Sequence, residues 1–290
     1  MRVRPSERRV LWTSTDFGDT RGSHGAWEMV DVTGDSVLLA GVSGRRSTDE
    51  MWFKSYGNVP EGDAVVMEIP FSALNSPPAA SSASWEKNWD GSDYTFITAK
   101  AARSAPGGGV LVLLWGEEAS ASLQLFDSQR QPVWGPTKYG EVHGEATDVS
   151  ISSDGTSAGI SGHGCIQCDD ELLGKMTSVR LSDGVLEWSE GFSVCDPTAH
   201  PSCTAIFNEC WGLQAVPSGG FVMACGAGIE NCDLLTGDNL SQCERDKPVA
   251  VDPRPGAKPR PPAVWMSFVV RVDANGRLLW QRVDQVGGNL

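Results

Sequence analysis

Short apolar segments alternate with glycine-rich turns along most of this chain. In four places an apolar strand leads into a tight Gly or Asp-Gly turn, and a second apolar strand follows and ends in glycine. Such turns supply the positive φ angles that a hairpin between two strands requires. The pattern therefore predicts four β-hairpins, at Trp27–Gly41, Ile97–Gly116, Ala146–Gly162 and Trp211–Gly226.

A second pattern follows each of these hairpins. It consists of an apolar-alternating strand, a polar turn and a short strand that carries tryptophan. Two hairpins per unit predict a four-stranded antiparallel sheet, which is the blade of a β-propeller. One such sheet cannot bury both faces alone, so we expect blades to stack with the recurrent Trp between them. The copies are Phe268–Trp280, Thr177–Trp188, Ser122–Trp134 and a looser one, in which a Ser/Ala/Pro loop over 72–84 separates Ala64–Pro70 from Trp85.

These repeats predict an all-β protein, a single β-propeller over residues 1–290. A strand at Arg9–Trp12 also resembles Arg277–Trp280, so both ends of the sequence fall in mid-pattern. We therefore expect about four blades of a larger ring; the alternative is a small closed ring whose N-terminal strand completes the last blade. The expected repeats are 13–89, 90–138, 139–192 and 205–285, with a Cys-rich and Pro-rich loop insertion at 227–263.

The turn and tryptophan motifs resemble the repeats of the quinoprotein-dehydrogenase-like (PQQ-like) β-propeller superfamily and, more loosely, other propeller repeats such as WD40. The residues that carry the resemblance are Asp154-Gly155, Ser218–Gly220, Asp273–Gly276, Trp188 and Trp280. The resemblance implies the propeller fold. Its members include redox enzymes, scaffolds and binding modules, so it carries function only weakly.

Charge and hydropathy exclude two classes of partner. The net charge of −14 opposes binding to nucleic acid and to anionic lipid head groups, both of which attract Lys and Arg. The longest apolar run is Val110–Trp115, far short of the roughly 20 residues of a membrane helix. We therefore expect no nucleic-acid partner and no membrane insertion.

The cysteines give the clearest indication of compartment. All 8 lie between Cys165 and Cys243, and such clustering favours disulfides in an extracellular or luminal protein. Asn239, in an Asn-Leu-Ser sequon, is a candidate glycosylation site. The basic start of the chain is not followed by the apolar segment of a signal peptide, so a cytoplasmic location with reduced thiols is the alternative. The disulfide candidates are Cys165, Cys168, Cys195, Cys203, Cys210, Cys225, Cys232 and Cys243.

Two cysteine arrangements suggest specific chemistry. His163, Cys165 and Cys168 have ligand types suited to zinc, but a structural site needs a second close pair that this chain lacks. A disulfide-bonded turn is the favoured interpretation there. Cys210 and Cys225 flank a hairpin turn, and simple counting places them diagonally on one face, where a bridge depends on the Cα separation.

No catalytic set can be assembled from the sequence. The four histidines, His24, His143, His163 and His200, fall in expected loops without a partner at fixed spacing, and we interpret them as solvated residues. Asp273–Gly276 lacks the later glutamate of a calcium loop and is interpreted as a turn. We predict no cofactor and no catalytic or metal-binding residues.

These observations favour a non-catalytic binding or scaffolding propeller segment that presents loops to a protein or glycan partner. The alternative is a propeller enzyme, of the quinone-dependent oxidoreductase or hydrolase type, with site residues partly outside this chain.

Overall fold

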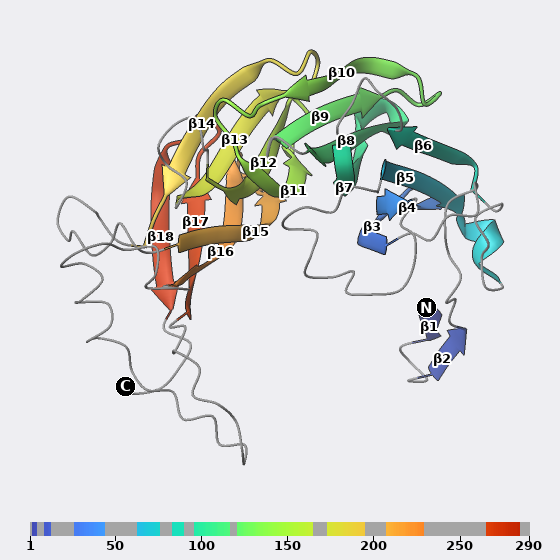
Figure 1. Cartoon of the computed structure of the whole chain (residues 1–290), viewed down its shortest axis with the longest axis horizontal. Coiled ribbons are helices and arrows are strands. Elements are labelled where there is room, and N and C mark those ends of the chain that lie inside the picture. The colour runs from blue at the N-terminus through green and yellow to red at the C-terminus, as the bar shows by residue number, and fades with distance from the viewer. Residues whose placement is uncertain are drawn as a thin grey trace. The chain divides into compact units, whose positions relative to one another are not determined.

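The computed structural model describes residues 2–4, 9–12, 26–43, 63–75, 83–89, 96–116, 121–164, 173–194, 207–228 and 265–284. Over these residues the chain forms strands, turns and two short 3-10 segments, Phe71–Asn75 and Pro106–Gly108, without an α-helix. The strands make four antiparallel four-stranded sheets and one two-stranded sheet (Figure 1). The all-β, blade-based propeller fold expected from the sequence is confirmed.

Each four-stranded sheet is a meander, with its strands paired in the order of the sequence. The first two sheets contain β3 (Ala26–Thr33), β4 (Ser36–Ser43), β5 (Asp63–Pro70) and β6 (Trp85–Trp89), and then β7 (Phe96–Ala105), β8 (Gly109–Gly116), β9 (Ala121–Phe126) and β10 (Pro132–Lys138). The other two contain β11 (Glu145–Ile151), β12 (Ser157–His163), β13 (Gly174–Arg180) and β14 (Leu186–Phe192), and then β15 (Phe207–Ala215), β16 (Phe221–Gly228), β17 (Trp265–Val272) and β18 (Leu278–Asp284). At the N-terminus β1 (Arg2–Arg4) pairs with β2 (Arg9–Trp12).

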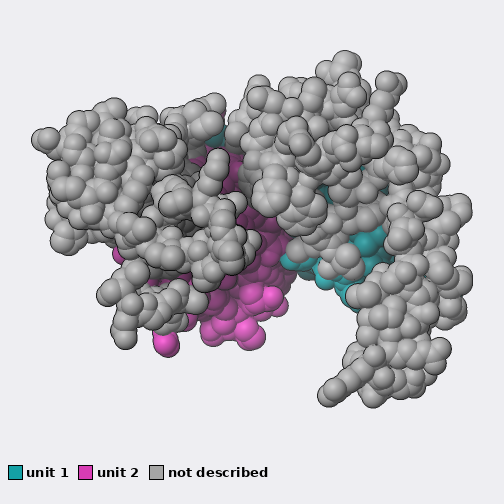
Figure 2. All heavy atoms as spheres, turned by 60° about the horizontal axis from the view of Figure 1, so that its bottom comes forward, with its two compact units in different colours: residues 1–140, 180–185 teal, residues 141–179, 186–290 magenta. Residues whose placement is uncertain are grey.

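The chain divides into two compact units, coloured separately in Figure 2. The first unit comprises residues 1–140 and 180–185, and the second comprises 141–179 and 186–290. The first therefore includes the turn of the hairpin β13–β14. A single ring over the whole chain stays a prediction.

In the first unit the sheets β3–β6 and β7–β10 enclose an apolar core. The core side chains come from alternate positions of each strand, which lie on one face of the sheet. Leu38 and Ala40 of β4 point to the same side, as do Ala64 and Val66 of β5. Phe126 at the end of β9 makes edge-to-face contacts with Trp85 and Trp89, with ring centroids 5.1 and 6.2 Å apart. The indole N–H of Trp89 donates to Gln124 Oε1 at 2.7 Å, so the buried ring also satisfies its polar atom.

The recurrent tryptophans of the outer strands contact the next outer hairpin at its turn. Trp134 Nε1 donates to Leu181 O at 2.8 Å, and its ring covers Gly184, where a Cβ would lie 2.8 Å from the indole. Trp188 repeats the arrangement in the second unit: its Nε1 donates to Ala274 O at 3.0 Å, and its ring covers Gly276. Both glycines have positive φ, 72° and 79°. The turn glycine thus serves the hairpin and the contact between sheets together.

We expect Gly276→Ala to lower the free energy of unfolding by about 2–3 kcal/mol. The new Cβ would lie 2.7 Å from the Trp188 ring, and alanine would hold a φ of 79°. Gly219→Ala is the matched control because Gly219 has a φ of 90° but no atom within 4 Å of the Cβ position. Urea unfolding followed by circular dichroism should show a loss of about 1 kcal/mol for the control. Equal losses would contradict the role of the tryptophan contact.

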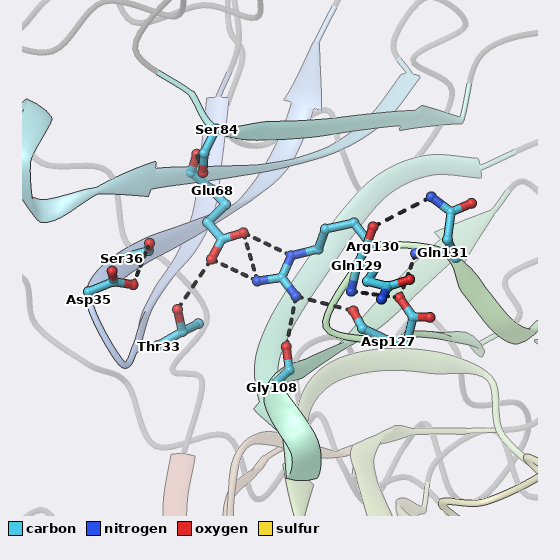
Figure 3. Close-up of polar contacts among 10 residues, drawn as sticks. All are labelled: Thr33, Asp35, Ser36, Glu68, Ser84, Gly108, Asp127, Gln129, Arg130 and Gln131. Carbon is cyan, nitrogen blue, oxygen red and sulfur yellow. Dashed lines mark hydrogen bonds and ion pairs between the residues drawn. The ribbon is translucent and has the colours of Figure 1, made fainter.

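In the turn between β9 and β10 an arginine replaces the turn glycine. Arg130 has a φ of 63°, the positive value that Gly184 and Gly276 adopt in the corresponding turns. Its guanidinium reaches back to Glu68 on β5, with Nε and Nη2 each 2.8 Å from a carboxylate oxygen, and Nη1 donates to Gly108 O at 2.8 Å (Figure 3). It also lies 5.7 Å from the centre of the Trp85 ring. Glu68 is buried, and the bidentate pair joins its sheet to the sheet that contains the Arg130 turn. The turns at Gly184 and Gly276 make the corresponding contact through a glycine that packs against a tryptophan ring.

Candidate functional site

The second unit presents one end of its two sheets to three long connections. The strands β11 and β15 begin at this end, and β12, β14, β16 and β18 finish there, because every sheet is an antiparallel meander. The connections 165–172, 195–206 and 229–264 start from this end and return to it, and they lie outside the described residues. They carry six of the eight cysteines and the sequon at Asn239. We call this part of the molecule the insertion end.

Both sheets share this end because β11 and β15 run side by side in the same direction. Asp148 Oδ2 accepts the backbone N–H of Leu213 at 3.0 Å, and Ser150 Oγ accepts that of Ala215 at 2.9 Å. Thr147 donates its hydroxyl to Cys210 O. β15 pairs with β16 alone, so its other edge carries backbone groups that need partners. Alternate polar side chains of β11 supply those partners.

A buried polar network lies at the base of the first connection. His143, just before β11, has its Nδ1 2.9 Å from Thr177 Oγ1. The Thr177 hydroxyl lies 2.9 Å from Ser189 Oγ, which donates to Val142 O at 3.1 Å. The network ties the residues before β11 to β13 and β14. The interpretation of His143 as a solvated loop residue is therefore wrong: its ring is fully buried.

Burial also sets the charge of this histidine. Desolvation lowers the pKa of His143 to about 3, and the nearby positive charges of Lys175 and His163 act in the same direction. Gly162 makes room for the ring, because a Cβ there would lie 2.7 Å from His143 Nε2. At neutral pH the imidazole is uncharged, and its position away from solvent gives no access to a substrate.

The second histidine of this end closes β12. His163 Nε2 lies 3.5 Å from Glu145 Oε2, across the first register pair of β11 and β12. Burial lowers the pKa of His163 to about 4. Gly144 N donates to Gly164 O at 2.7 Å, and Gly164 N donates to Leu173 O at 2.8 Å, so the backbone is bonded up to the start of the connection. His163 is thus part of the sheet, not of a loop.

The start of the second connection is held in the same way. Asn208 on β15 accepts the backbone N–H of Val194 through Oδ1 at 3.2 Å, and its Nδ2 donates to Ser193 Oγ at 3.3 Å. Gln281 on β18 donates to Ser193 O at 2.8 Å. Side chains from two strands, β15 and β18, therefore fix the two residues that precede Cys195.

A disulfide joins β15 to β16, the strand from which the third connection departs. Cys210 and Cys225 are bonded, and both are buried among Met176, Phe268 and other residues of the second core. They are register partners, not the diagonal pair that simple counting gives. A bulge between Cys210 and Gly212 adds one residue to β15 and brings Cys210 directly opposite Cys225. The other six cysteine candidates and Asn239 lie outside the described residues.

Removing this disulfide should cost about 2–3 kcal/mol of unfolding free energy. The bridge closes a loop with a sequence separation of 15 residues, and its loss frees that loop in the unfolded chain. The double variant Cys210→Ala/Cys225→Ala tests this by urea denaturation, with Cys210→Ala alone as a control for the unpaired thiol that remains at Cys225. An unchanged unfolding midpoint in the double variant would contradict the expectation.

The polar side chains described at the insertion end bind neighbouring strands and the residues next to the connections. Over the described ranges, no group of three or more His, Cys, Asp or Glu side chains is arranged to hold a metal ion. His163 faces Glu145, and its suggested zinc partners Cys165 and Cys168 lie outside those ranges, as do His24 and His200. Asp273–Gly276 is a turn, in which Asp273 Oδ1 accepts the N–H groups of Asn275 and Arg277 at 2.8 and 3.0 Å.

Comparisons with known proteins find similar solved structures but no family. No family model matches the chain, and no curated protein matches it either. Among solved structures it is similar to the β-propeller domain of the Trilobed protease from Pyrococcus furiosus, at 6% identity and a TM-score of 0.41, over 92% of this chain and 58% of that one. It is also similar to a europium-containing methanol dehydrogenase, at 10% identity and a TM-score of 0.45, over 94% of this chain and 43% of that one.

A quinohemoprotein alcohol dehydrogenase from Pseudomonas putida HK5 is a third similar structure, at 14% identity and a TM-score of 0.41, over 87% of this chain and 41% of that one. The chain thus spans about half the length of these proteins. They include two dehydrogenases and the propeller domain of a protease. No helix among the described residues is long and apolar enough to cross a membrane.

Proposed function

We propose that this chain is a binding or scaffolding propeller segment of an extracellular or luminal protein, and that the insertion end presents its connections to a protein or glycan partner. The observation that carries the proposal is the concentration of the three long connections at one end of two sheets. Loops on a rigid scaffold are where binding residues usually lie. Here the scaffold is rigid at their bases, through the His143 network, the Asn208 contacts and the Cys210–Cys225 bridge.

The non-catalytic part of the proposal rests on how the ionisable groups are used. His143 and His163 are neutral at physiological pH and engaged with neighbouring strands, and Asp148 accepts a backbone N–H of β15. Each of these groups stabilises the scaffold. The disulfide is compatible with an oxidising compartment.

A loop-replacement experiment tests the proposal. Residues 230–262 are replaced by a short Gly-Ser linker, and the biotinylated protein is applied to a glycan array and to a panel of purified secreted proteins. The matched control replaces residues 76–82, which connect β5 to β6 in a sheet of the first unit. We expect the parent chain and the control variant to bind the same ligand with similar affinity. The 230–262 variant should bind that ligand at least about tenfold more weakly.

Two results would contradict the proposal. If both loop variants bound the ligand with equal affinity, the insertion end would not be the recognition surface. Reduction of a redox dye after reconstitution with Ca²⁺ and pyrroloquinoline quinone would instead favour the oxidoreductase alternative.

A further inference from the structure

The last sheet of the chain is buried mainly on one side. Along β16, Phe221, Met223 and Cys225 are buried, whereas Val222 is half-buried and Ala224 is exposed. β17 shows the same alternation, with Phe268 and Val270 buried and Val269 half-buried. The middle strands of the sheets β7–β10 and β11–β14 differ, because β8, β9 and β13 are buried along nearly their whole length.

The less buried side carries the repeat tryptophan. Val222 is the register partner of Arg271, which pairs with Trp280, and Ala224 pairs with Val269. Cross-strand partners share a face of a sheet, so one surface, here called the Trp280 face, carries Val222, Ala224, Val269, Arg271, Trp280 and Arg282. Trp280 is 48% exposed. This face spans three strands and combines apolar side chains with two arginines, of which Arg271 is buried and donates to Ser218 Oγ and Gly219 O.

The preceding sheet shows what such a face contacts. Trp188 pairs with Ser178, and Met176 lies further along the same side of β13. Both Ser178 and Met176 are fully buried, and Met176 packs into the core that contains Phe221, Phe268 and Val270 of the next sheet. Above this contact Trp188 donates to Ala274 O and covers Gly276. The equivalent face of β11–β14 is therefore covered by a blade.

We propose that the Trp280 face is the docking surface of a further propeller blade. Its outer hairpin turn places a glycine of positive φ against the Trp280 ring and a backbone carbonyl at Nε1, as the turns at Gly184 and Gly276 do for Trp134 and Trp188. The apolar side of that blade covers Val222, Ala224 and Val269.

The occupant is a further repeat and not a second copy of this chain. Three tight outer turns are described in the chain, and a tryptophan already contacts each of them: Trp85 at Arg130, Trp134 at Gly184 and Trp188 at Gly276. The first sheet has a 3-10 segment, Phe71–Asn75, and a long connection at the corresponding place. A second copy therefore has no unoccupied turn of this kind among its described residues.

A duplicated blade tests the proposal. In the extended protein, Asp284 is followed directly by a second copy of residues 193–290, which repeats the connection from β14 to β15. We expect slow amide exchange in the appended blade and in the peptide that contains Trp280. Trp280→Ala should lower the Tm of the extended protein by about 5 °C and change that of the original chain by no more than about 1 °C.

Val283→Ala is the matched control, because Val283 is also exposed on β18 but pairs with Phe268 on the other side of the sheet. It should have the same effect in both proteins. The proposal would be overturned if the amides of the appended blade exchanged as fast as those of an unfolded segment. It would also be overturned if Trp280→Ala lowered the Tm of the two proteins equally. If native mass spectrometry showed a dimer of the original chain, and Trp280→Ala dissociated it, the face would bind a second copy instead.

Discussion

Replacing Arg130 with alanine should lower the free energy of unfolding by about 3–4 kcal/mol. The variant leaves the Glu68 carboxylate buried without the two bonds, at 2.8 Å each, that the guanidinium supplies. Loss of one partner of a buried ion pair is costly because the remaining charge stays out of water. It also removes the contact with Gly108 O and the cation above Trp85. Urea unfolding followed by circular dichroism measures the loss.

Two further variants separate the causes of this loss. Arg130→Gly should cost about 1 kcal/mol less than Arg130→Ala, because glycine holds a φ of 63° without strain. Arg180→Ala is the control for a surface pair: Arg180 and Asp183 are also 2.8 Å apart but about half exposed, so we expect a loss below about 1 kcal/mol. Similar losses for Arg130→Ala and Arg180→Ala would show that burial of Glu68 does not matter.

The contrast between Arg130 and the turn glycines shows how far the sequence predicts this fold. Alternation and turn residues predict the hairpins because both are local properties. They also predict that a tryptophan lies between blades, which Trp134 and Trp188 do. Nothing local distinguishes Arg130 from a solvated turn residue. Its role depends on Glu68, which is 62 positions away.

The disulfide and the insertion end differ in what the sequence reveals. The proximity of Cys210 and Cys225 follows from the hairpin, but the bulge at Trp211 that sets their register has no clear sequence signal. The insertion end, by contrast, could be predicted once the strands are counted, since alternate connections of a meander lie at the same end. The sequence patterns located one of the three connections, as the insertion at 227–263, and did not place the other two beside it.

The burial of His143 could not be predicted, because the residues that cover it come from several strands. Thr177 and Ser189, which extend its network, lie 34 and 46 positions further along the chain. A histidine between a Gly-rich turn and a strand has the same local sequence whether it is solvated or buried. Gly162 gives no specific signal either, because a side chain there would meet the Glu145 carbonyl before it met the ring.

The stability of the protein should fall steeply below about pH 6.5, before the carboxylates begin to titrate. In the unfolded chain both histidines take up a proton near the ordinary pKa of 6.5, whereas in the folded protein burial lowers their pKa values to about 3 and about 4. The unfolded state therefore binds more protons below pH 6.5. The free energy of unfolding is highest above that pH and decreases by up to about 1.4 kcal/mol per pH unit for each histidine.

Urea denaturation between pH 7.5 and 5.0 measures this slope above the ordinary pKa range of Asp and Glu. His143→Gln removes one proton-binding group, so its stability should depend on pH about half as steeply as that of the parent chain, whatever its stability at pH 7.5. His163→Gln should give a similar reduction, and the double variant should be nearly flat. If the dependence of stability on pH were unchanged in His143→Gln, the His143 ring would take up its proton equally in the folded and unfolded states. That result would contradict the burial of the ring within the network of Thr177 and Ser189.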